Sequence, residues 1–89
     1  MKKYTVIIQN SARKALKNLD IQVRNRIVEW IEKNLKDCTN PRFQGKTLKG
    51  KLAGKWRYRV GDYRLICEIR DDVLVVLVLE IGHRSNIYR

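Results

Sequence analysis

Most of the side chains that could act on a nucleic-acid phosphate lie in the second half of the chain. They are Lys55, Arg57, Arg59, Arg64, His83, Arg84 and Tyr88. Arginine suits a phosphate because its planar guanidinium matches two phosphate oxygens and keeps its charge. Cleavage of RNA by its own 2′-hydroxyl needs a base for that hydroxyl, charge stabilisation on the pentacovalent phosphate and an acid for the leaving oxygen. As a set, these residues favour a phosphate-handling site.

The proton-transfer step has two candidates in this set. The arginines are unsuited as bases because they do not lose their charge. Lys55 could serve, since neighbouring cations favour the neutral form of an amine. His83 could serve because imidazole ordinarily titrates near neutral pH. Tyr88 could stack on a base of single-stranded RNA. Taken singly, however, His83 is as easily a surface residue, and Tyr88 a packing residue.

A predicted hairpin positions the first cations. Gly61-Asp62 suits a two-residue turn between strands at about 55–60 and 63–70. This turn pairs Val60 with Tyr63, Arg59 with Arg64, Tyr58 with Leu65 and Arg57 with Ile66. One face is then aromatic and aliphatic, and the other carries four cations. Directly opposed like charges cost roughly 0.2–1 kcal/mol per pair, so a chain that tolerates them is expected to hold negative charge there. The alternative is an ordinary solvated face on which Glu68 offsets part of the charge.

Two helices are expected before the hairpin. Residues 3–8 indicate a first strand, and Asn10 or Ser11 could cap a short helix that runs to Leu19. Asp20 could cap a longer helix with one apolar face. That face comprises Val23, Ile27, Trp30, Ile31 and Leu35. Asn40-Pro41 marks a stop beyond it. Residues 42–54 are glycine-rich and basic, which predicts a mobile loop with little regular structure.

The last predicted strand spans about 73–81, after a tight turn at Asp71-Asp72. Residues 73–79 are apolar on both faces, which predicts a central strand covered on both sides. The element order is therefore β-α-α-β-β-β in a single domain, residues 1–89. We expect an α+β fold with an antiparallel sheet, one outlier strand and two N-terminal helices packed on one face. The other face is left partly open.

Charge and composition narrow the class of partner. The chain has 20 Lys and Arg against 9 Asp and Glu, a net charge of +11. Such a surface favours nucleic acid, an anionic membrane or an acidic protein. The apolar run at 73–79 is too short to span a bilayer, which argues against a membrane protein. Cys38, Cys67 and the single histidine are too few soft ligands for a structural zinc site. We therefore expect an intracellular, cytoplasmic protein that needs neither a metal nor a cofactor.

Several motifs resemble the RelE branch of the RelE/ParE toxin superfamily. They are LKG at 48–50, KWRYRVGDYRLI at 55–66, GHR at 82–84 and IY at 87–88. The resemblance covers essentially the whole chain. It implies a sheet-and-helix fold related to microbial RNases, cleavage of mRNA in the ribosomal A site and a cognate, RelB-like antitoxin. The positions that match the family's catalytic residues are Lys55, Arg57, Arg64, Arg84 and Tyr88. The family pattern has lysine where this chain has Arg57 and a basic residue where it has His83.

This resemblance leads to a working assignment of roles. Arg64 and Arg84 are expected to stabilise the phosphate, Tyr88 to orient a base, and Lys55 or His83 to move protons. Further RNA contacts are expected from Lys46, Lys49, Lys51 and Arg59. The main rival is a ParE-like toxin that inhibits DNA gyrase without cutting nucleic acid, because it shares the fold. Degenerate family members and simple nucleic-acid-binding modules are further alternatives.

Overall fold

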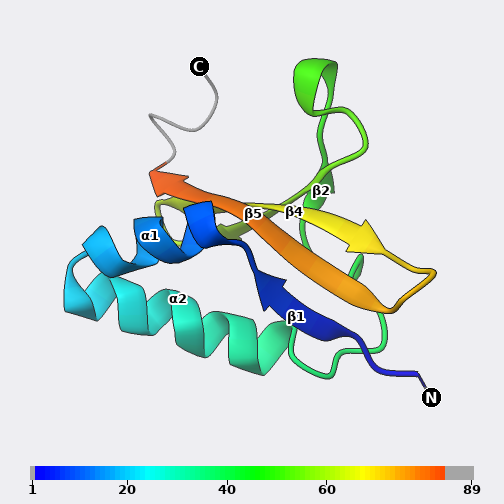
Figure 1. The fold of residues 1–89 in the computed structure, drawn as a ribbon, viewed down its shortest axis with the longest axis horizontal. Coiled ribbons are helices and arrows are strands. Elements are labelled where there is room, and N and C mark those ends of the chain that lie inside the picture. The colour runs from blue at the N-terminus through cyan, green and yellow to red at the C-terminus, as the bar shows by residue number, and fades with distance from the viewer. Residues whose placement is uncertain (1, 84–89) are drawn as a thin grey trace.

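The computed structural model describes residues 2–83, so Arg84 and Tyr88 lie outside the described residues. These described residues form two α-helices and a five-stranded sheet (Figure 1). The helices are α1 (Asn10–Asn18) and α2 (Ile21–Asn34). The strands are β1 (Thr5–Ile8), β2 (Lys46–Thr47), β3 (Trp56–Val60), β4 (Tyr63–Arg70) and β5 (Val75–His83). The predicted α+β fold is confirmed.

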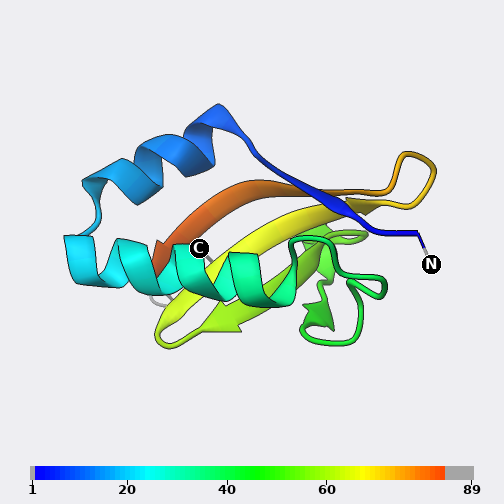
Figure 2. The same ribbon diagram turned by 90° about the horizontal axis from the view of Figure 1, so that it is seen from below.

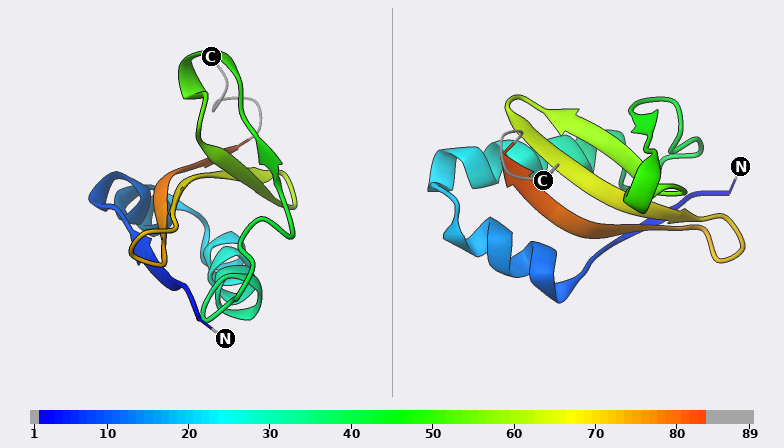
Figure 3. Two further views of the ribbon diagram at one scale, coloured as in Figure 1. Left: turned by 90° about the vertical axis from the view of Figure 1, so that its right-hand side faces the viewer. Right: turned by 90° about the horizontal axis from the view of Figure 1, so that it is seen from above.

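The sheet has the strand order β1-β5-β4-β3-β2. β1 runs parallel to β5, and the other neighbours are antiparallel. α1 and α2 carry the chain from β1, at one edge of the sheet, across to β2 at the other edge. Both helices lie on the same side of the sheet (Figures 2 and 3). The opposite side, here called the open face, is covered by neither α1 nor α2 (Figure 3).

The helix termini differ in how they are capped. Asp20 accepts a hydrogen bond from the backbone N–H of Gln22 at 3.2 Å, which confirms the predicted cap of α2. The predicted cap of α1 was wrong, because that helix already begins at Asn10 after Gln9, whose side chain makes no capping bond. The hydroxyl of Ser11 instead donates to the carbonyl of Leu79 at 2.9 Å and ties α1 to β5.

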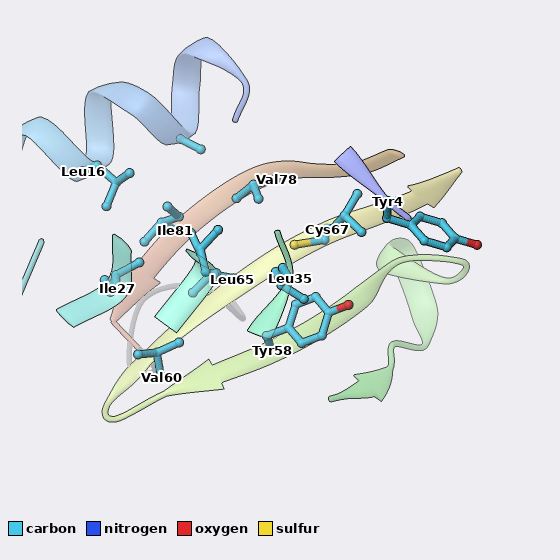
Figure 4. Packing of buried hydrophobic residues seen from close by; sticks show 13 residues of the cluster. Tyr4, Leu16, Ile27, Leu35, Tyr58, Val60, Leu65, Cys67, Val78 and Ile81 are labelled. Atoms are coloured by element: carbon cyan, nitrogen blue, oxygen red, sulfur yellow. The ribbon is translucent and has the colours of Figure 1, made fainter. Parts of the chain in front are cut away.

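The hydrophobic core lies between the sheet and the two helices (Figure 4). Tyr58, Leu65, Cys67 and Val78 point from the sheet toward the helices and are fully buried. Ala12, Leu16, Ile27, Ile31 and Leu35 meet them from α1, α2 and the end of α2. These helix residues recur every four positions, the spacing that places them on one side of each helix.

The prediction that the last strand is covered on both sides was wrong. β5 is interior, between β1 and β4, as expected of a central strand. On the helix side Val76 and Val78 are fully buried, whereas Leu77 on the open face is only half-buried. The strand also begins later than predicted, because residues 71–74 form a four-residue turn with Leu74 at φ 55°. Val73 lies in that turn and is exposed.

The segment 42–54 is more ordered than its composition suggested. Lys46 and Thr47 form β2 and pair with Arg57 and Trp56 of β3. Residues Gly50–Leu52 form a single 3-10 turn. The indole N–H of Trp56 donates to the carbonyl of Gln44 at 2.7 Å, which attaches the start of the segment to the sheet. The rest of the segment projects away from the helices (Figure 3).

Candidate functional site

The hairpin register brings the predicted cations together on the open face. Val60 pairs with Tyr63, Arg59 with Arg64 and Arg57 with Ile66, as the turn at Gly61 predicted. Gly61 has φ +60°, the conformation that favours glycine in such a turn. Directly opposed residues share a face, so Arg57, Arg59 and Arg64 lie together on the side away from the helices.

Arg64 is the most unusual of these cations because its side chain is buried. It is 7% exposed, although it does not face the helix-side core. Its Nε and Nη1 atoms are buried and have no hydrogen-bond partner among residues 2–83. The Nε atom of neighbouring Arg57 is in the same situation. Buried charged donors without acceptors are costly, and an anion on this face would satisfy them.

Lys55 lies at the other end of the cationic row and contacts a carboxylate. Its Nζ atom donates to Oε1 of Glu68 at 3.2 Å. The other carboxylate oxygen of Glu68 lies 3.5 Å from Nε of Arg70. Glu68 therefore brings negative charge into the cationic row, where the sequence predicts it only as a partial offset of the charge. Glu80, opposite Ile66 in the β4–β5 register, shares the same face. The register itself contained the signal, because Trp56 opposite Cys67 places Lys55 next to Glu68.

His83 does not join the cations. The register places it opposite Tyr63, which lies opposite Val60 of the helix-side core. The rings of His83 and Tyr63 meet edge to face, with centroids 5.5 Å apart. Because alternate residues of a strand point to opposite faces, His83 lies on the helix side while Arg64 lies on the open face.

The remaining predicted RNA contacts surround the open face. Lys46 is opposite Arg57 in the β2–β3 pairing and therefore shares its face. Lys49 and Lys51 lie in the projecting segment, before and within its 3-10 turn, and both are exposed. The predicted set is thus divided: five cations share one face, two lysines stand beside it, and His83 is on the other side. The five are Lys46, Lys55, Arg57, Arg59 and Arg64.

The cysteines give no sign of a reactive or metal-binding role. Both Cys38 and Cys67 are free thiols. Burial raises the pKa of the Cys67 thiol to about 12, so little thiolate exists at neutral pH. Within residues 2–83, no three His, Cys, Asp or Glu side chains gather as a metal site would require. No helix in the described part of the chain is long and apolar enough to cross a membrane.

Comparison with known proteins finds similar sequences along nearly the whole chain. A family described as "ParE toxin of type II toxin-antitoxin system, parDE" matches residues 6–88. Toxin RelG of Mycobacterium tuberculosis is 36% identical over 97% of both chains. Toxin RelE of the same organism is 34% identical over 97% of this chain and 87% of that toxin.

Solved structures extend the similarity to the fold. The RelBE2 toxin–antitoxin complex of M. tuberculosis contains a chain with a TM-score of 0.84 and 34% identity, covering 97% of each chain. The isolated Escherichia coli RelE toxin has a TM-score of 0.64 and 26% identity, covering 96% of this chain and 90% of that toxin.

Proposed function

Because the chain belongs to the RelE branch of the RelE/ParE superfamily of type II toxin–antitoxin toxins, we propose that it is an endoribonuclease that cleaves mRNA in the ribosomal A site. In the proposed reaction the 2′-oxygen attacks the adjacent phosphorus while the bond to the 5′-oxygen breaks. A base takes the proton of the 2′-hydroxyl, and an acid gives a proton to the departing 5′-oxygen. The proposed reaction uses no metal or cofactor.

The burial of Arg64 is the observation that carries this proposal. Its buried Nε and Nη1 atoms lack acceptors among the described residues, and Arg59 and Arg57 share its face. A scissile phosphate would supply the missing acceptors and the compensating negative charge. Because charge grows on the phosphate in the transition state, donors fixed beforehand stabilise that state more than the substrate.

Proton transfer is assigned to Lys55 rather than to His83. Lys55 shares the open face with Arg57 and Arg64, whereas His83 is on the helix side. Glu68, 3.2 Å from Lys55 Nζ, is the group that positions the amine. We retain the family-based roles of Arg84 in phosphate stabilisation and Tyr88 in base orientation. Lys46, Lys49, Lys51 and Arg59 are proposed to contact RNA phosphates, including those of ribosomal RNA.

The proposed partners follow from the same assignment. The mRNA substrate is presented by the ribosome, which locates the protein in the cytoplasm. A RelB-like antitoxin is proposed to silence the toxin, because the similar M. tuberculosis chain was solved in a toxin–antitoxin complex. An acidic or amphipathic antitoxin segment would complement a chain of net charge +11.

Primer extension on a defined mRNA in a reconstituted translation reaction tests this function. Wild-type protein is expected to cut at A-site codons only when ribosomes are present. Arg64→Ala should lose at least about 100-fold in rate, the typical effect of removing one transition-state donor. Arg24→Ala is the matched control, because it removes the same charge from α2, on the side of the sheet away from the open face. Equal cleavage by wild type and Arg64→Ala would contradict the proposed site.

Inhibition of DNA gyrase is the second candidate, favoured by the description of the matching family as ParE toxin. A gyrase inhibitor binds its target and has no evident need for buried phosphate donors. A supercoiling assay separates the two functions. Inhibition of gyrase by a protein that cuts no mRNA, with or without ribosomes, would establish the ParE-like activity instead.

A further inference from the structure

A second cationic groove lies outside the open face, between α2 and the β3–β4 turn. Its volume is about 490 Å³, and residues of α2, of β3 and of the turn after β3 line it. The charged residues that line it are Arg26, Glu29 and Lys33 of α2 and Arg59 of β3. Three cations against one carboxylate make the groove attractive to an anion.

The cations of the groove are available for a ligand. Arg26, Lys33 and Arg59 are exposed, and none of them forms an ion pair within the described residues. Arg26 and Lys33 are seven positions apart, which places them on one side of α2 with roughly 10 Å between them along the axis. A polynucleotide carries charges at closer spacing than this, so each cation can meet a different phosphate.

Arg59 connects this groove with the open face. It lines the groove, and it also lies opposite buried Arg64 in the hairpin register. β2 pairs only with Trp56 and Arg57, so no strand of the described chain covers the outer edge of β3 beside Arg59. A ligand strand can therefore pass from the open face around this edge to α2 without meeting another strand.

The groove is built to recognise a backbone rather than a base. Trp30 lies in it but is half-buried, and its ring is held 5.4 Å from that of fully buried Tyr58. A ring held in this way offers little free surface for stacking. The amide of Asn34 is already hydrogen-bonded to Trp30 and Gln44. The contacts that remain for an anion are those with Arg26, Lys33 and Arg59, and contacts to phosphates carry no sequence information.

We propose that this groove binds the phosphate backbone of an RNA strand that continues from the open face. The choice of RNA as the ligand rests on the proposed function. Arg26 and Lys33 hold phosphates beyond the cleavage position, and Arg59 bridges the two surfaces. Binding through this groove is independent of base sequence and sensitive to salt.

The test measures binding of a short 2′-O-methyl RNA of mixed sequence, which lacks the attacking hydroxyl and is not cut. Dissociation constants are determined over a range of KCl concentrations for wild type and the double variant Arg26→Ala/Lys33→Ala. Loss of two phosphate contacts should reduce the slope of log affinity against log salt by about 1.4 in magnitude. The matched control Lys14→Ala/Lys17→Ala removes the same charge from exposed positions of α1 and should keep the wild-type slope.

The proposal that the groove binds RNA would be contradicted by an unchanged salt slope in Arg26→Ala/Lys33→Ala. An equal reduction of that slope in the α1 control would contradict it too. Circular dichroism of both variants verifies that they fold. Cleavage by wild-type protein is measured separately on unmodified mRNA in the reconstituted translation reaction, with ribosomes present. If wild type cleaves mRNA but the slope of Arg26→Ala/Lys33→Ala is unchanged, only the proposed RNA binding by the groove is refuted. If that slope is reduced but wild type does not cleave, RNA binding by the groove is supported and the proposed nuclease activity is refuted.

Discussion

At the residue scale, the two proton-transfer candidates are separated by the face on which each lies. Lys55 is beside the cations and contacts Glu68, while His83 packs edge to face on Tyr63 on the helix side. We expect Lys55→Ala to lower the single-turnover rate of mRNA cleavage by about 100-fold or more, as loss of a general acid or base does. His83→Ala should stay within several-fold of wild type.

Lys14→Ala is the control for this comparison, because it removes an exposed lysine of α1 that has no part in proton transfer or in the proposed RNA contacts. Lys55→Arg keeps the charge and the pairing with Glu68 but cannot exchange a proton, so it should be as slow as Lys55→Ala. Full activity in the double variant Lys55→Ala/His83→Ala would exclude both residues from proton transfer.

At the element scale, Asp71 ties the β4–β5 turn to two other parts of the chain. It accepts a hydrogen bond from the Tyr4 hydroxyl at 2.6 Å and two from the Arg42 guanidinium at 3.0 Å each. These contacts hold the pKa of the Asp71 carboxyl below its ordinary value near 3.8, and the hydrogen bonds from Arg42 have the largest effect. They attach the turn to the segment before β2 and to the residue that precedes β1.

This lowered pKa predicts how stability depends on acid. A carboxyl whose pKa is lower when folded stabilises the protein above its unfolded pKa, and the gain is lost as pH falls through the folded pKa. The free energy of unfolding of wild type should therefore fall more steeply below about pH 4 than that of Asp71→Asn. Urea denaturation at a series of pH values through this acidic range measures the free energy of unfolding of both proteins.

Asp72→Asn is the control for the acid dependence, because Asp72 makes no hydrogen bond or ion pair among the described residues. It should keep the wild-type dependence on pH. If the free energy of unfolding depended on pH equally in Asp71→Asn and wild type, the contacts of Asp71 with Tyr4 and Arg42 would not contribute to stability.

At the scale of the whole molecule, the folded protein combines a high positive net charge with a small size. The net charge is +11, and the radius of gyration is 12.4 Å. Self-repulsion opposes such a compact state, and a partner that neutralises the charge should stabilise it. We expect the product of a neighbouring reading frame, the proposed antitoxin, to copurify with the chain.

At a concentration about 100-fold above its dissociation constant, the antitoxin should add about 2.7 kcal/mol of stability. For a domain of this size that raises the melting temperature by roughly 10–20 °C, measurable by differential scanning fluorimetry. An unrelated acidic protein of similar size is the control for simple charge neutralisation. An equal shift with that control, or no copurifying partner, would contradict a specific antitoxin.

The sequence by itself determined the hairpin and the elements with strong local patterns. The alternation of basic and apolar residues in 55–60, together with Gly61, which accepts a positive φ, was enough to predict the pairing of Arg59 with Arg64. The apolar spacing likewise predicted α2 and its Asp20 cap. These features could be predicted because they depend on side-chain period and turn geometry within a few residues.

Only the tertiary structure decided which residues share the site. The β4–β5 register contains an irregularity between Ile66 and Cys67, and it places Gly82 rather than His83 opposite Arg64. A shift of one residue changes the face of every side chain that follows, so strand composition could not locate His83. The burial of Arg64, the order in β2 and the groove beside α2 likewise depend on contacts between segments far apart in the chain.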